Sequence, residues 1–340
     1  DPNLNVVHWD ALDPNAPNFG EKRPWVAPDP ENRMNYFFKT GVKLTNNIAL
    51  EGGSDKGSFR LSYTNIEETG ILPNSKIQKN TLNFSGDYDL SKRLKAEANI
   101  TYTKGNATGR YGTGYDGKNV MQSFGQWFQT NVDFKRLEEK YLRADGSQLS
   151  WNSSYYDDLH PIYFDNPYWV RYKNYQDDKR DRIFGYSALT YKFNDWLNLK
   201  YKISVDSYTE IQNERIAIGS VDLSDFTSIW RRNQEINQDI FLNFQKRFGD
   251  ISVNGLLGAN TRRNTVEAIV GSTVGGLVVP DLWAVSNSVA PVFVDESQAK
   301  WGTNSLFGSV SLGYKDFLYL DITDRYDVSS TLPTGQNGFN

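Results

Sequence analysis

Long stretches of this chain alternate apolar and polar residues with a period of two. In residues 80–90 every second position is apolar or glycine and falls on one side: Leu82, Phe84, Gly86, Tyr88 and Leu90. Residues 93–103 repeat the pattern directly after Ser91 and Lys92. Such alternation is typical of a β-strand with one apolar face, and two such runs around a tight turn predict a hairpin.

The same alternation predicts about ten long strands. They cover residues 58–66, 80–90, 93–103, 183–193, 197–207, 238–248, 251–261, 305–314 and 317–323, with a shorter candidate that begins at Asn46. No two of these runs are separated by the helix that a parallel crossover would require, so we expect an antiparallel sheet. The predicted fold class is therefore all-β.

The connections between the predicted strands alternate in length. Five are tight, at 52–57, 91–92, 194–196, 249–250 and 315–316, whereas long ones are expected at about 104–181, 208–236 and 262–304. Short turns at one end and long loops at the other are typical of an outer-membrane β-barrel. The tight turns are flanked by aromatic residues that would suit a membrane interface: Tyr88, Phe193, Trp196, Phe248, Tyr314 and Phe317.

Composition removes several other classes. Only 38% of the residues are hydrophobic, and no window offers the roughly 18 uninterrupted apolar residues of a transmembrane helix. The 37 Lys and Arg residues are outnumbered by 41 acidic ones and form no basic block, so nucleic acid is not an expected partner. The chain has no cysteine, which removes disulfides and thiolate metal sites. A soluble antiparallel sandwich remains the alternative, but its strands and turns are usually shorter.

Motifs that would indicate an enzyme are weak. Residues 112–119 have the spacing of a phosphate-binding loop, but Asn119 stands where Ser or Thr is needed, so a glycine-rich surface loop is favoured. His8 and His160 are the only histidines, too few for a histidine metal site. Acidic residues near 157–165 could bind calcium, although a solvated acidic loop fits their spacing better. We expect no enzyme activity, no catalytic residues, no cofactor and no metal.

The long connection at about 104–181 carries the candidate binding residues. Its apolar positions between Lys118 and Leu142 have nearly helical spacing and predict a short amphipathic helix. Aromatic rings beside amides and carboxylates then follow, which suits stacking and hydrogen bonding to a sugar or a peptide. The candidate substrate-binding residues are Trp127, Trp151, Tyr155, Tyr156, Tyr168 and Trp169. The alternative is that these rings pack the loop on itself.

Several segments resemble a known family in order along the chain. They are FFKTG at 37–41, ALEGGSDKGSFRLSYTNIEETGILPNS at 49–75, RLKAEANITYT at 93–103, DNPYWVRY at 165–172, DRIFGYSALTYKFNDWLNLK at 181–200 and YLDITDRYDVSSTLP at 319–333. They are similar to the SusC/RagA-like TonB-dependent transporters of Gram-negative outer membranes. In the last segment, Val328 stands where the family usually has an aromatic residue.

The resemblance implies a transmembrane barrel of 22 antiparallel strands, a plug domain, a SusD-like surface lipoprotein that acts as a lid, and energy supplied through TonB. Nothing here matches the plug or the segment that TonB pulls on, so residues 1–340 are expected to be a partial β-barrel domain, with 104–181 as a large outer loop. The remaining part of the transporter would then supply the other strands.

The function implied is active import of a large polar nutrient, an oligosaccharide or an oligopeptide, across the outer membrane of a Gram-negative bacterium. The protein would contact TonB through the plug region and outer-membrane lipid through the apolar face of its strands. The alternative function is a structural or docking platform for surface or secretion machinery. Dependence on TonB would distinguish the two functions, because a platform needs no energy supply.

Overall fold

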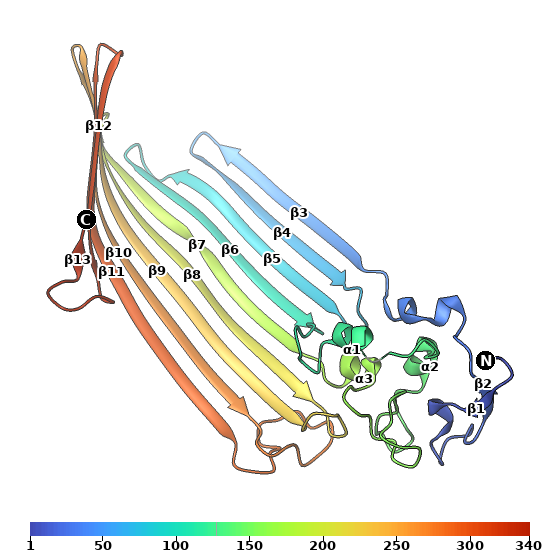
Figure 1. Cartoon of the computed structure of the whole chain (residues 1–340). Coiled ribbons are helices and arrows are strands. Elements are labelled where there is room, and N and C mark those ends of the chain that lie inside the picture. Colours follow the sequence, from blue (N-terminus) through green and yellow to red (C-terminus); the bar gives the residue numbers. More distant parts are fainter. Residues whose placement is uncertain (127) are drawn as a thin grey trace.

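A computed structural model describes residues 1–126 and 128–340 (Figure 1). Within these residues an 11-stranded antiparallel sheet dominates, and each of its strands pairs with its neighbours in the chain. The ten long strands confirm the prediction of an all-β, antiparallel fold. Their bounds are β3 Val42–Ser54, β4 Gly57–Thr69, β5 Lys76–Asp89, β6 Leu94–Thr108, β7 Asp177–Asn194, β8 Leu197–Ile216, β9 Asp225–Phe248, β10 Ile251–Ser272, β11 Phe293–Tyr314 and β12 Leu318–Ser329, followed by the short β13 Gly338–Phe339.

The remaining elements are short. Within the described residues, three α-helices and three 3-10 helices lie outside the sheet, together with a separate two-stranded pair near the N-terminus. Their bounds are β1 Asn5–Val7, η1 Trp9–Ala11, β2 Lys22–Pro24, η2 Pro30–Asn32, η3 Met34–Phe37, α1 Val120–Gln126, α2 Phe134–Glu139 and α3 Pro167–Tyr172. Among the described residues, no helix has both the length and the apolar character needed to cross a membrane.

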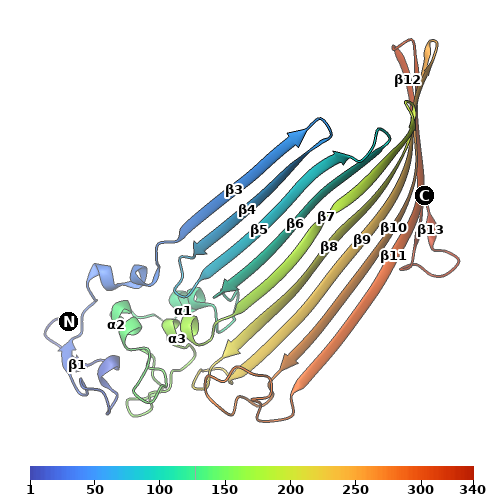
Figure 2. The same cartoon turned by 180° about the vertical axis from the view of Figure 1, so that it is seen from behind.

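The connections are short at one end of the sheet and longer at the other (Figure 2). The short end consists of the turns 55–56, 90–93, 195–196, 249–250 and 315–317. At the opposite end, residues 109–176 join β6 to β7 and contain all three α-helices. The predicted alternation of tight and long connections is therefore present.

Two predicted loops are mostly strand. The stretches 208–236 and 262–304 were expected to be long connections, but the structure leaves only 217–224 and 273–292 outside strands. The strands continue because residues such as Arg231, Arg232 and Glu235 pair across the sheet although both faces are polar there. Alternation of apolar and polar residues stops where the apolar face stops, whereas backbone pairing does not.

Register gives the sheet two different faces. Cross-strand partners such as Leu82 and Tyr102, or Leu199 and Leu242, place their side chains on one apolar face. The same pairing places Asp206 opposite Glu235 on the other, polar face. Near the short turns, every long strand alternates apolar and polar side chains in this way. The sheet therefore has an apolar band on one face and hydrogen-bonding groups on the other.

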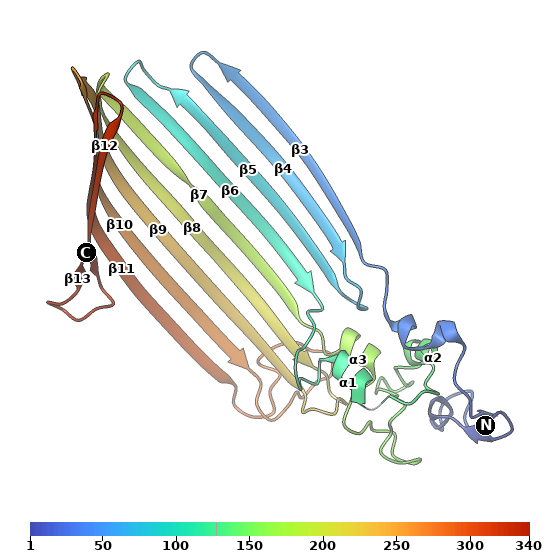
Figure 3. The same ribbon diagram turned by 45° about the horizontal axis from the view of Figure 1, so that its top comes forward.

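The main cluster of buried apolar side chains belongs to the region before β3 and to segment 109–176, whose helices lie beyond the long-connection end of the sheet (Figure 3). Segment 109–176 packs there against the region before β3, and the central ring is Phe37, which makes edge-to-face contacts with Phe124 at 5.0 Å and Tyr168 at 5.1 Å between ring centroids. The cluster comprises Phe37, Val120, Phe124, Val132, Phe134, Leu137, Trp151, Tyr168 and Val170.

The single helix predicted between Lys118 and Leu142 is instead two separate helices, α1 and α2. Asp133 caps the second one, because its side chain accepts the backbone N–H of Arg136 at 3.0 Å. Apolar residues at nearly helical spacing therefore come from two elements that face the same core.

The sheet is open in this chain. β3 forms one edge and β13 the other, and the described residues contain no pairing between these two edges. The strand order and the long, tilted ribbons match a barrel wall, and the wall is not closed.

Candidate functional site

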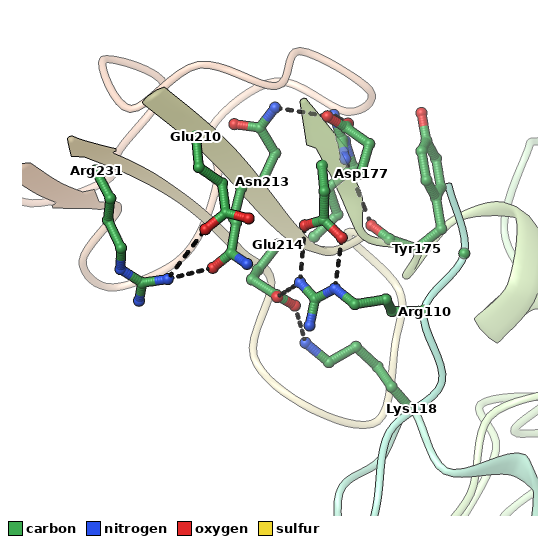
Figure 4. Close-up of polar contacts among 12 residues, drawn as sticks. Arg110, Lys118, Tyr175, Asp177, Glu210, Asn213, Glu214 and Arg231 are labelled. Atoms are coloured by element: carbon green, nitrogen blue, oxygen red, sulfur yellow. Dashed lines mark hydrogen bonds and ion pairs between the residues drawn. The ribbon is translucent and has the colours of Figure 1, made fainter. Parts of the chain in front are cut away.

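The polar face of the sheet carries a network of charged side chains at the long-connection end (Figure 4). Arg110 and Lys118 come from segment 109–176, and both point to Glu214 near the end of β8. Arg110 Nη2 donates to Glu214 Oε1 at 2.6 Å, and Lys118 Nζ donates to Glu214 Oε2 at 2.8 Å. The Arg110 guanidinium also donates to both carboxylate oxygens of Asp178 on β7. These bonds fix the segment to two strands.

Further polar pairs lie at the ends of β7–β9, on both faces of the sheet. Arg231 on β9 donates to Gln212 at 2.7 Å and lies 3.9 Å from the Glu210 carboxylate. On the opposite face, Asn213 donates to Asp177 at 2.8 Å, and Arg215 pairs with the same carboxylate (Figure 4). Arg215 also lies 4.5 Å above the ring of Tyr175.

Further along the polar face, opposite charges are paired between adjacent strands, as in Arg182 of β7 with Asp206 of β8, or over one strand, as in Lys200 of β8 with Glu97 of β6. Arg182 Nε donates to Asp206 at 2.8 Å, and Lys200 Nζ donates to Glu97 at 2.8 Å. Arg180 stacks on Tyr208, with 4.0 Å between its guanidinium carbon and the ring centroid. Fixed donors, acceptors and rings on one surface can hydrogen-bond and stack against a polar ligand.

The DNPYWVRY motif joins segment 109–176 to the β8–β9 connection. Asp165 is buried, and its carboxylate accepts from Gln148 at 2.6 Å and from the backbone N–H of Val221 at 2.7 Å. Burial raises the pKa of Asp165 to about 6, although hydrogen bonds from Gln148 and Val221 act in the opposite direction. Trp169 Nε1 donates to Ser220 Oγ at 2.8 Å in the same junction.

The second half of the motif contacts the β4–β5 connection and the start of segment 109–176 through Arg171. This side chain is 2% exposed and donates to three backbone carbonyls: Pro73 at 2.8 Å, Gly109 at 2.6 Å and Arg110 at 3.2 Å. Burial lowers its pKa to about 10. The planar guanidinium suits this role, since it spreads several donors over one site.

The helix α3 inside this motif was missed by the sequence reasoning, although its signals were present. Asn166 accepts the backbone N–H of Tyr168 at 2.9 Å as the N-cap, and Pro167 occupies the first helical position. An Asn-Pro pair before apolar residues is a helix start signal. The charge pairs of the polar face were also missed, because pairing them requires the strand register.

The five predicted binding residues that the structure describes do not form one surface. Tyr155 and Tyr156 are exposed, with relative exposures of 71% and 75%. The side chains of Trp151, Tyr168 and Trp169 are buried, with relative exposures of 9%, 0% and 2%. This favours the alternative that these rings pack the segment on itself. Burial also raises the pKa of the Tyr168 hydroxyl. Trp127 lies outside the described residues.

The residues considered for other chemistry are engaged in local contacts. Lys118, in the glycine-rich stretch 112–119, pairs with Glu214, and Asp165 is surrounded by hydrogen-bond donors. Asp158 pairs with His160 at 2.8 Å on the surface. Within the part of the chain that the structure describes, no three His, Cys, Asp or Glu residues gather as metal ligands would.

Comparisons with known proteins agree on the architecture. No family model matches the chain. It is 23% identical, over 302 residues, to TonB-dependent receptor P3 of Formosa agariphila, a match that covers 86% of this chain and 29% of that protein. This chain therefore spans less than a third of the curated relative's length.

Solved structures show the same fold. The RagAB peptide importer in its open-open state aligns with a TM-score of 0.75 at 15% identity, covering 99% of this chain and 37% of that one. The RagAB peptide transporter aligns with a TM-score of 0.72 at 16% identity, covering 92% and 35%. The chain thus has the barrel-wall fold of the SusC/RagA-like TonB-dependent transporters, the family that its sequence motifs indicated.

Proposed function

We propose that this chain is part of an outer-membrane transporter of a Gram-negative bacterium that imports a large polar nutrient, driven through TonB. The observation that carries this proposal is the contrast between the two faces of the sheet. One face has an apolar band suited to lipid, and the other has paired charges such as Arg182 with Asp206. Such a polar face suits the lining of a channel that passes a hydrophilic solute.

The partners follow from the same proposal. Because the sheet is open and the chain covers 29% of its curated relative, we propose that the remaining part of the transporter closes the barrel and supplies the plug that TonB engages. Residues 1–340 would form a partial barrel domain. Its segment 109–176 would lie at the outer mouth of the barrel. A SusD-like lipoprotein would then close over that mouth as a lid.

Substrate contact is proposed for the aromatic residues of segment 109–176. Tyr155 and Tyr156 have exposed rings that a sugar or a peptide could stack on. Trp127 is proposed as a further contact. The buried Trp151, Tyr168 and Trp169 would act by holding the segment in shape, since the core around Phe37 includes two of them.

Uptake by cells that carry the whole transporter tests the proposal. Cells lacking their own copy would receive the full-length gene, and uptake of fluorescent oligosaccharides and oligopeptides would be measured with and without TonB. We expect uptake of one of the two classes, abolished when TonB is deleted. Uptake unchanged without TonB would overturn active import. If cells without the gene lose surface complexes, and cells with the gene take up neither class of nutrient, the docking platform would be favoured instead.

A further inference from the structure

The apolar face of the sheet is not smooth near the short turns. A hollow of about 650 Å³ opens there across β3–β8. Its floor is made of residues with little or no side chain on adjacent strands, Gly86, Ala96 and Ala98. Its walls are larger apolar side chains that include Phe59, Phe84 and Leu189.

The floor of this hollow depends on Gly86. A Cβ atom at this position would lie 3.0 Å from the backbone oxygen of Ser58, 3.2 Å from the Phe84 ring and 3.3 Å from the Phe59 Cβ. A side chain would therefore fill the space and push the two rings apart. Ala98 is the direct cross-strand partner of Gly86, so the depression continues onto β6.

A second hollow lies at the adjoining turns, and strand register places its residues Asp89, Lys95 and Lys192 on the polar face. It encloses about 440 Å³, and its lining contains one acidic residue, Asp89, and five basic residues. The basic residues are Lys56, Lys92, Arg93, Lys95 and Lys192. Lys95 pairs with Asp87 at 3.0 Å. Across the residues that the structure describes, the other four have no carboxylate within ion-pair distance, and all four are exposed.

The cations that can complete a lipid site at the apolar hollow are those of the turns themselves, Lys56, Lys92 and Arg93. Gly86 and Leu90 are four residues apart, about 13 Å along an extended strand, so the apolar hollow reaches to within an acyl chain's length of the basic turns. An apolar groove that ends in unpaired cations complements an acyl chain that ends in a phosphate. Annular lipid without a fixed position would require neither the small-residue floor nor the cations.

We propose that the apolar hollow and the cations of the turns form a specific site for an anionic glycerophospholipid, with one acyl chain over Gly86 and Ala98 and the phosphate near Lys92 and Arg93. The site goes beyond nutrient import, but it rests on the proposed membrane setting of the apolar face. A second protein docked on this face is the other possible occupant, and the experiment below separates it from a lipid.

Native mass spectrometry of the whole transporter complex tests the site. The complex would be stripped of lipid in detergent and titrated with phosphatidylglycerol, with phosphatidylcholine as the neutral comparison. We expect one phosphatidylglycerol molecule per transporter to persist at collision energies that remove phosphatidylcholine. Equal loss of both lipids, or a retained second polypeptide in place of lipid, would overturn the proposal.

Two independent variants locate the site. Ala98→Phe fills the apolar hollow, and the double variant Lys92→Gln/Arg93→Gln removes two cations while leaving the hollow intact. Each is expected to lower retained phosphatidylglycerol about tenfold. The controls are Ala259→Phe, elsewhere on the same face, and Arg247→Gln/Lys315→Gln, at the end of β9 and in the β11–β12 turn. Controls that lower lipid retention equally would overturn the assignment.

Folding and transport are followed separately in these variants. Heat-modifiable migration in gels shows whether the barrel has assembled, and the double variant keeps the test valid if Ala98→Phe does not fold. Nutrient uptake is measured in the same cells. Loss of lipid binding with uptake retained would support the lipid site independently of the substrate. Failure of uptake in the unaltered transporter would count against the proposed import function and not against the lipid site.

Discussion

The Asp165 carboxylate accepts the backbone N–H of Val221 at 2.7 Å, which joins the DNPYWVRY motif to the β8–β9 connection. Gln148 donates to the same carboxylate oxygen at 2.6 Å. Asn174, just beyond the motif, accepts the backbone N–H of Ala217 at 2.8 Å in the same connection. One of the segments that resemble a known family thus holds the long segment 109–176 against the β8–β9 connection.

The raised pKa of Asp165 predicts a pH-dependent junction. Burial raises this pKa from 3.8 to about 6, so the folded junction binds a proton more tightly than the unfolded chain. The stability from this group is therefore fully present below about pH 4 and is lost as pH rises through about 6. A shift of roughly two units corresponds to about 3 kcal/mol, or on the order of a hundredfold in opening.

Hydrogen exchange at Val221 measures this effect. After correction for the intrinsic rate, protection of the Val221 amide is expected to fall between pH 4 and pH 6 and to stay constant above pH 7. The variant Asp165→Asn has no titrating group at this position, so its corrected profile should be flat. The same slope in Asp165→Asn would show that another group is responsible.

Arg171 is predicted to be essential for docking segment 109–176. The variant Arg171→Met leaves the carbonyls of Pro73 and Gly109 buried without their donors, which should cost about 3 kcal/mol. Limited proteolysis within 109–176 should become faster. The control is Lys173→Met, which removes an exposed pair with Asp281 and should cost less than about 1 kcal/mol. Equal proteolysis of both variants would contradict this role.

Exposed and buried aromatic residues are predicted to act differently. Replacing Tyr155 and Tyr156 together by alanine should weaken substrate binding by roughly tenfold without changing barrel assembly, since each exposed ring offers stacking alone. The control is Tyr115→Ala, another exposed tyrosine of the same segment. Binding measured by isothermal titration of the whole complex decides the matter, and unchanged affinity in the double variant would remove these residues from the site.

Replacing Trp151 and Trp169 by alanine should instead loosen the segment. Each truncation of a buried aromatic residue costs about 3–5 kcal/mol, and Trp169 also loses its hydrogen bond to Ser220. We expect faster proteolysis of 109–176, with substrate affinity reduced only as a consequence. Reduced affinity with an intact, protease-resistant segment would restore these tryptophans as direct contacts.

Much of the fold could be predicted from local patterns, but the site could not. Alternation located every long strand, because a strand with one apolar face has a period of two whatever it packs against. It failed at the ends of β8–β11, where polar side chains occupy both faces. Trp151 and Tyr155 have similar polar neighbours in sequence, yet one is buried and the other exposed. Only tertiary packing distinguishes them.

Two adjacent leucines test which face of the sheet meets lipid. Leu257 lies on the apolar face of β10, opposite Leu242, and Leu256 lies on the polar face, opposite Asn243. An arginine on the lipid face of a barrel costs about 2–4 kcal/mol near the middle of the bilayer, whereas the polar face can solvate it. We therefore expect Leu257→Arg to reduce the amount of assembled transporter strongly and Leu256→Arg to reduce it little, as measured by heat-modifiable migration of outer-membrane fractions. If Leu256→Arg were the more damaging of the two, the faces would be reversed and the polar face could not line a channel.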